Sequence, residues 1–254
     1  MSSKFKYWVE KYKIPSGPLI HVGAHLVQER DEYSDSNFTP VLWFEAIPEV
    51  AEKAQNILKH YPGQKLLNYA LWSTAGVKKK FYFAGHEGSS SSLLEPYLIS
   101  ASHPEVVKTD EISIVTSTLD LELDKLEKKV RFSVLVLDVQ GAEIDVINGG
   151  KNTMKDIDYI ISEISQIELY RATSKIEELT KILNEYGFTF VASEINRATG
   201  WGEGLFIRRS ILDETTKMQF EHLIIGKYIA KGRLLRTIIL KLKDLKAKSQ
   251  GEKL

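Results

Sequence analysis

The chain has 254 residues, 43% hydrophobic and 27% charged, which suits one large α/β domain or two small ones. It contains no Cys, which excludes disulfides, thiolate–zinc sites and cysteine nucleophiles and favours a cytoplasmic location. No apolar run reaches the roughly 18 residues that span a bilayer. Because the N-terminus also lacks the apolar core of a signal peptide, we do not expect secretion.

The formal net charge is zero, but the charges are unevenly distributed. Residues 217–254 carry ten Lys and Arg against three Asp and Glu, a net charge of +7, which leaves −7 for the rest. An acidic body argues against a nucleic-acid-binding core, so we expect no nucleic-acid partner.

Strand-like and helix-like patterns alternate along residues 1–210. The expected strands are 19–22, 41–45, 65–70, 77–83, 112–116, 133–138, 158–164, 188–191 and 205–207. The expected helices are 1–13, 48–60, 119–129, 142–150 and 174–186. This alternation predicts an α/β fold with a doubly wound, mostly parallel, Rossmann-like sheet and right-handed crossovers. We expect one catalytic domain over 1–210 and a helical tail over 211–254.

Residues 132–147 carry the strongest functional signal. The apolar run Val134–Leu137 predicts a strand buried on both faces, and it ends in Asp138. Gly141 and a second acid, Glu143, follow at the start of a helix-like segment. Open α/β sheets bind ligands at the carboxyl ends of their strands, and carboxylates are costly to bury, so this pattern predicts a site.

Another acid, Glu45, supports a nucleoside-like ligand. The first strand ends at Gly23 and Ala24, where glycine lets the backbone approach a ligand closely. Glu45 ends the next strand, 22 residues after Gly23, close to the spacing of an acid that accepts hydrogen bonds from ribose hydroxyls. Because no glycine-rich phosphate loop is present, NAD and ATP are disfavoured.

The segment Asp138-Val-Gln-Gly-Ala-Glu143, followed by Val146-Ile-Asn-Gly-Gly150, resembles the signature of FkbM-type methyltransferases. Further features in the family's order are His21–His25, Glu45-Ala46, Asn68–Leu71 with Gly76, Ser90–Leu93 and Thr118–Asp120. The chain differs at His21, His25 and Ala46, where this family commonly has Asp, Asn and Pro.

The resemblance implies a class I methyltransferase fold and S-adenosyl-L-methionine as the cofactor, which has a ribose but no phosphate. It also implies an acceptor hydroxyl on a sugar, a glycan or a small natural product. The expected cofactor-binding residues are His21, Gly23, Ala24, His25, Glu45, Ala46, Asn68, Ala70, Ser91, Asp138 and Gln140.

An alcohol nucleophile benefits from a general base, and Asp138, Glu143 and Glu163 are the candidates because they lie near the carboxyl ends of expected strands. Glu143 has a second interpretation, in which it holds loop amides at a helix start. His21 and His25 are four residues apart on a strand-to-loop segment, a poor arrangement for zinc, and we expect no metal site.

The acceptor site is expected to involve residues 84–110 and the loops after the fourth and fifth strands of the sheet. Two further candidate bases and three candidate sugar-stacking rings lie in or near these segments: His86, His103, Tyr97, Tyr170 and Trp201.

The basic tail has leucines and isoleucines at near-helical spacing, which predicts an amphipathic helix. It could lie on an anionic membrane, contact a second copy of the chain, or pack on its own domain. Two alternatives to a methyltransferase also stay open. One is a non-catalytic Rossmann-like binding or scaffold protein, consistent with the departures at His21, His25 and Ala46. The other is a nucleotide-dependent enzyme of another class.

Overall fold

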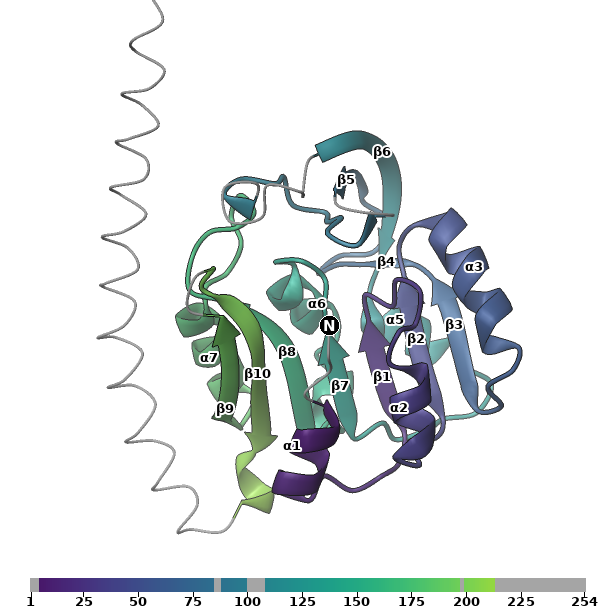
Figure 1. Ribbon diagram of the computed structural model, residues 1–254, viewed down its shortest axis with the longest axis vertical. Helices are drawn as coiled ribbons and strands as arrows, with labels where there is room; N and C mark the ends of the chain where they lie inside the picture. The colour runs from purple at the N-terminus through teal and green to yellow at the C-terminus, as the bar shows by residue number, and fades with distance from the viewer. Residues whose placement is uncertain (1–4, 85–87, 100–107, 197–198, 213–254) are drawn as a thin grey trace, which may run out of the picture. The chain divides into compact units, whose positions relative to one another are not determined.

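The computed structural model describes residues 5–84, 88–99, 108–196 and 199–212. A seven-stranded sheet with the order β3-β2-β1-β7-β8-β10-β9 forms its centre (Figure 1). These strands are β1 Leu19–Val22, β2 Val41–Glu45, β3 Gln64–Asn68, β7 Val134–Leu137, β8 Tyr159–Ser165, β9 Phe188–Asn196 and β10 Trp201–Arg208.

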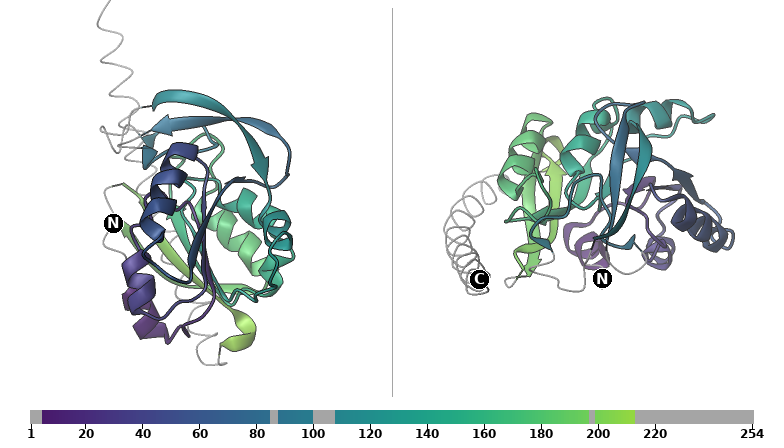
Figure 2. Two further views of the ribbon diagram at one scale, coloured as in Figure 1. Left: turned by 90° about the vertical axis from the view of Figure 1, so that its right-hand side faces the viewer. Right: turned by 90° about the horizontal axis from the view of Figure 1, so that it is seen from above.

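Two layers of helices cover the sheet, as the view along its edge shows (Figure 2). One layer contains α1 Phe5–Tyr12, α2 Arg30–Asp35 and α3 Pro48–Leu58. The other contains α5 Leu119–Asp124, α6 Glu143–Gly149 and α7 Ile176–Glu185. This arrangement confirms the predicted doubly wound α/β architecture, and its strand order is typical of class I methyltransferases.

The direction of β10 distinguishes this sheet from a fully parallel one. β1, β2, β3, β7 and β8 run parallel, whereas β10 pairs antiparallel with both β8 and β9. Because β10 is reversed, its first residues lie at the same edge as the last residues of β7 and β8. Residues near the start of β10, such as Trp201 and Glu203, therefore join the ligand-binding edge.

Local sequence explains the central elements. All four residues of β1 and all four of β7 are buried, as expected for apolar strands covered on both faces. Pro48 occupies the first turn of α3, where its missing N–H costs no hydrogen bond. The spaced apolar residues Ile176, Leu179 and Leu183 bury one face of α7.

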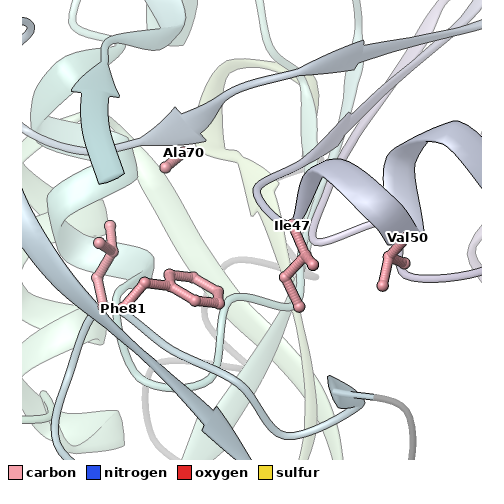
Figure 3. Packing of buried hydrophobic residues seen from close by; sticks show 5 residues of the cluster. Ile47, Val50, Ala70 and Phe81 are labelled. Carbon is pink, nitrogen blue, oxygen red and sulfur yellow. The ribbon is translucent and has the colours of Figure 1, made fainter. Parts of the chain in front are cut away.

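A smaller sheet with the order β4-β6-β5 lies beyond the carboxyl ends of β1 and β7 (Figure 1). Its strands are β4 Ala70–Leu71, β5 Lys78–Ala84 and β6 Lys108–Ser117. An apolar cluster fastens this sheet to the start of α3 (Figure 3), and its buried members are Ile47, Val50, Ala70, Phe81 and Leu93.

Several predicted boundaries were wrong: β6, β9 and β10 are longer than expected, and α2 was not expected. The expected strand 65–70 is divided, because β3 ends at Asn68 and β4 joins the smaller sheet. The helix expected over 119–129 ends at Asp124. β8 continues to Ser165, so Glu163 lies within the strand rather than at its end.

The expected tail helix lies almost entirely outside the described residues. Among the helices in the described ranges, none has the length and apolar character needed to cross a bilayer.

Candidate functional site

Gly23 brings two loops into contact at the carboxyl edge of the sheet. It has a φ of +92°, and a Cβ there would lie 1.8 Å from the backbone oxygen of Asp138. Any side chain would therefore collide with the loop that follows β7. Glycine is required here both for the left-handed backbone and for the close approach.

Glu45 shapes the loop beyond β2. Its Oε2 accepts a hydrogen bond from the His25 N–H at 2.8 Å, and its Oε1 accepts one from the Ile47 N–H at 2.8 Å. Burial raises the pKa of Glu45, and these amide hydrogen bonds oppose that rise. The carboxylate joins the loops after β1 and β2, and its remaining lone pairs border the adjacent pocket.

A pocket of about 620 Å³, measured with the solvent at its mouth, lies between these loops and the smaller sheet. Seven of the expected cofactor residues line it: Gly23, His25, Glu45, Ala46, Ser91, Asp138 and Gln140. Phe81 and Leu93 of the apolar cluster also line it. The pocket combines an apolar wall with a few polar groups, as small-molecule sites usually do.

Asp138 and Glu163 form a pair of carboxyl groups beside this pocket. The Gln140 side chain bridges the two carboxyl groups, because its Nε2 donates to Asp138 at 2.7 Å and to Glu163 at 3.0 Å. Burial raises the pKa of both, and the charge of Asp138 raises that of Glu163 further. A proton on one of the two acids removes the repulsion between their charges.

Glu143 makes the contacts expected from its loop-holding interpretation. Its Oε1 accepts from the Val139 N–H at 3.3 Å and from the Gly141 N–H at 3.1 Å. The side chain is buried, and burial raises its pKa to about 7 despite these hydrogen bonds. Glu143 therefore shapes the loop that carries Gln140.

A further acid at this edge, Glu203, was not predicted from the sequence. Glu203 lies opposite Glu163 in the β8–β10 ladder, and Leu137 pairs with Ser162 in the β7–β8 ladder. Asp138, Glu163 and Glu203 thus form a cross-strand row. Burial first and the charge of Asp138 second raise the pKa of Glu203 to about 7. The alternation of Trp201, Glu203 and Leu205 was the available signal.

His21 and His25 occupy different environments. The His21 ring stacks on Trp43 at 4.6 Å between ring centroids, its Nδ1 hydrogen-bonds the Tyr33 hydroxyl at 2.9 Å, and it does not line the pocket. Burial lowers the pKa of His21 to about 4, so the imidazole is neutral. His25 lines the pocket.

Three expected cofactor residues, Ala24, Asn68 and Ala70, do not line the pocket but contact residues around it. Ala24 donates its N–H to the Phe44 carbonyl, and Asn68 Nδ2 donates to the Glu45 carbonyl at 2.8 Å. Ala70 is buried in the apolar cluster. Ser91, which does line the pocket, accepts from the Ala84 N–H at 3.1 Å through its Oγ.

A second, narrower pocket of about 370 Å³ adjoins the acid pair. Its lining includes Glu143, Glu163, Tyr170 and Trp201. Tyr97 does not line this pocket, and its ring lies under the Arg171 guanidinium at 4.7 Å. The other acceptor-side candidates, His86 and His103, lie outside the described residues.

The residues at this edge fit S-adenosyl-L-methionine. Gly23 lines the pocket without a side chain, and Phe81 and Leu93 give it an apolar wall for a flat ring. Glu45 presents a carboxyl group for hydroxyl groups, and Asp138 places a second carboxyl group in the pocket wall, where it suits a cation. No three of the His, Asp and Glu side chains in the described ranges are placed to hold a metal ion.

Solved structures share this fold. The chain is similar to Streptococcus pneumoniae Sp1610 in complex with S-adenosyl-L-methionine, with 12% identity, a TM-score of 0.52, and coverage of 96% of this chain and 91% of that one. It is also similar to M. capricolum TrmK in complex with S-adenosyl-homocysteine, with 11% identity, a TM-score of 0.51, and coverage of 96% and 87%. At these identities the likeness shows the fold. No curated protein matches the chain.

The strand order and these neighbours identify the class I methyltransferase fold. The sequence profile described as the Methyltransferase FkbM domain matches residues 21–190, so the chain belongs to the FkbM methyltransferase family. This result confirms the predicted family and cofactor. The earlier alternatives of a nucleotide-dependent enzyme of another class and of a non-catalytic scaffold are therefore not retained.

Proposed function

We propose that the protein transfers a methyl group to a hydroxyl oxygen of a sugar, a glycan or a small natural product, with Asp138 as the general base. The observation that carries this proposal is the Asp138–Glu163 carboxyl pair beside the cofactor pocket. When bound, S-adenosyl-L-methionine supplies an electrophilic methyl group. The chain must supply an oriented acceptor and a group that takes its proton.

The acid pair suits proton removal from an alcohol. Burial raises the pKa of Asp138 above its usual range, which brings its basicity closer to the operating pH. The acceptor oxygen forms a bond to the methyl carbon as the carbon–sulfur bond breaks, and the bonding electrons stay on sulfur. The hydroxyl proton passes to Asp138, and the Gln140 amide holds that carboxyl group in place.

The charged residues that line the two pockets favour an acceptor without a charge of its own. Neither pocket is lined by Lys or Arg among the described residues, while Asp138, Glu143 and Glu163 contribute carboxyl groups. A phosphate or carboxylate on the acceptor would be repelled, whereas sugar hydroxyls can donate hydrogen bonds to carboxylates.

The test is transfer of label from methyl-tritiated S-adenosyl-L-methionine to a panel of methyl glycosides, oligosaccharides and polyhydroxylated natural products. We expect an alkali-stable methyl ether. Asp138→Asn should lower kcat by about 10²–10⁴-fold, as expected for loss of a general base. Asp124→Asn, which affects an exposed ion pair with Lys129, should retain activity. Methylation of nitrogen or carbon, or full activity of Asp138→Asn, would contradict the proposal.

A further inference from the structure

The Gln140 side chain is fixed from both ends. Its amide nitrogen donates to Asp138 and Glu163, and its amide oxygen accepts a hydrogen bond from the Tyr170 hydroxyl at 2.8 Å. A carboxylate accepts hydrogen bonds but cannot donate them, so an ionised pair requires the NH₂ end of the amide. The Tyr170 hydroxyl has one proton and two acceptors, the Gln140 amide oxygen at 2.8 Å and the Ser90 carbonyl at 3.0 Å, and donation to the nearer acceptor requires that same orientation.

The backbone of Gln140 is held in an unusual conformation. Its φ is +55°, a left-handed conformation that is uncommon for a residue other than glycine. The Ser92 hydroxyl donates to the Gln140 carbonyl at 2.9 Å, and Glu143 holds the amides on both sides. Such conformations persist where surrounding contacts determine them, and they gather at functional sites.

Tyr170 also connects the acid pair to the loop over the cofactor pocket. Its hydroxyl lies 3.0 Å from the Ser90 carbonyl, and Ser89 and Ser91 line that pocket. The ring is almost fully buried, with 2% of its surface exposed. Burial raises the pKa of Tyr170 far above its usual range, so the hydroxyl stays protonated and remains a donor.

We propose that Tyr170 is a positioning residue that keeps the Gln140 amide turned with its NH₂ group toward Asp138 and Glu163, so that this pair can ionise in the wall of the cofactor pocket. The inference rests on the function proposed above. Without the hydroxyl, the amide can turn and present its oxygen, which a carboxyl group tolerates only when it is protonated. Removing the hydroxyl should therefore move ionisation of the pair to higher pH.

Other titratable groups also affect the pair and are left unchanged by the test. They come from β1, the segment before α2, α6 and β10, and they are His21, Glu29, Glu143 and Glu203. His21 is neutral over the relevant range because burial lowers its pKa to about 4. The remaining three acids are the same in wild type and variant, so a difference between the two proteins reports the change at Tyr170.

The experiment is a calorimetric titration of the full chain with S-adenosyl-L-methionine and with S-adenosyl-homocysteine from pH 5 to pH 8. Only the first ligand carries a sulfonium charge, so the ratio of the two dissociation constants reports negative charge in the pocket wall. Titration of the ligands themselves is common to all proteins compared. The wild-type ratio should shift toward S-adenosyl-L-methionine as pH rises and the pair ionises.

Tyr170→Phe should move the midpoint of that shift upward by about one pH unit, the size expected for loss of one oriented hydrogen bond. Gln140→Met should move it in the same direction, and the double variant should move it no further, because both act through one amide. Tyr61→Phe is the matched control, since it removes a tyrosine hydroxyl that donates to Asp31 at 2.5 Å and lines neither pocket.

Unchanged midpoints in Tyr170→Phe, with ligand binding intact, would overturn the inference alone. If that variant does not fold, Gln140→Met carries the same prediction and the same refutation. Absence of cofactor binding in folded wild type would overturn the proposed function and the inference together. The two failures are therefore distinguishable.

Discussion

Glu45 and the Asp138–Glu163 pair are carboxyl groups at the same edge of one sheet, but their surroundings differ. Backbone amides hold both oxygens of Glu45, whereas a side-chain amide bridges the pair. Backbone donors cannot turn away or change protonation, so Glu45 is a fixed part of the scaffold. The pair depends on side chains that can move, so its protonation state can respond to its surroundings. Glu45 fixes the shape of the loops, whereas the acid pair is where we propose proton transfer.

The largest effect should come from breaking the contact that joins the loop after β1 to the loop after β7. Gly23→Ala places a methyl group 1.8 Å from the Asp138 carbonyl oxygen, at a φ of +92°. We expect the free energy of unfolding to fall by about 3 kcal/mol or more in urea denaturation, with loss of cofactor binding.

Gly76→Ala is its control, because Gly76 has a φ of +76° but no atom within 4 Å of the added Cβ. Only the backbone cost of about 1 kcal/mol should remain. Equal losses in the two variants would mean that the approach of the loops contributes nothing.

The next effect concerns Glu45. Glu45→Gln keeps the shape of the side chain but points an NH₂ group at one of the backbone amides that Glu45 now accepts from. We expect a loss of about 1–3 kcal/mol in unfolding free energy and a weaker affinity for S-adenosyl-L-methionine by calorimetry. The exposed neighbour Glu49, changed to Gln, should alter stability by no more than about 0.5 kcal/mol. If Glu45→Gln changes neither the free energy of unfolding nor the affinity, the contacts with the backbone amides are dispensable.

The smallest expected effect concerns Glu203, beside the acid pair, and here the substitution should raise the free energy of unfolding rather than lower it. The folded-state pKa of Glu203 is raised from an ordinary 4.5 to about 7. Its contribution to stability is therefore complete below pH 4.5 and is lost as pH rises to about 7. Glu203→Gln should make the protein more stable than wild type at pH 8, by about 1–2 kcal/mol after allowance for partial exposure, and equally stable at pH 4.

Urea denaturation at both pH values measures this, with the exposed Glu177→Gln as control. If Glu203→Gln is less stable than wild type at pH 8, the ionised side chain has a stabilising partner, and repulsion within the row of acids does not decide its effect on stability.

The sequence was informative where a pattern is local. Apolar runs fixed β1 and β7, and the spacing from Gly23 to Glu45 located the pocket. Glu203 was missed because Gly202 and Gly204 flank it, and glycine weakens any strand pattern. Its position opposite Glu163 follows from the reversed direction of β10, which is a property of strand pairing and not of the segment itself. The bridge from Tyr170 to Gln140 spans 30 residues and has no signal in either neighbourhood.

The reversed strand also has a consequence for protein engineering. β9 and β10 form an antiparallel unit that reaches the edge of the acid pair through Trp201 and Glu203, yet none of the described residues of these two strands lines the larger pocket. Libraries confined to the start of β10 would vary the surroundings of the acid pair and leave every cofactor-pocket side chain intact. If the acceptor binds beside the acid pair as proposed, directed evolution of acceptor preference can target this unit without changing the residues that line the larger pocket.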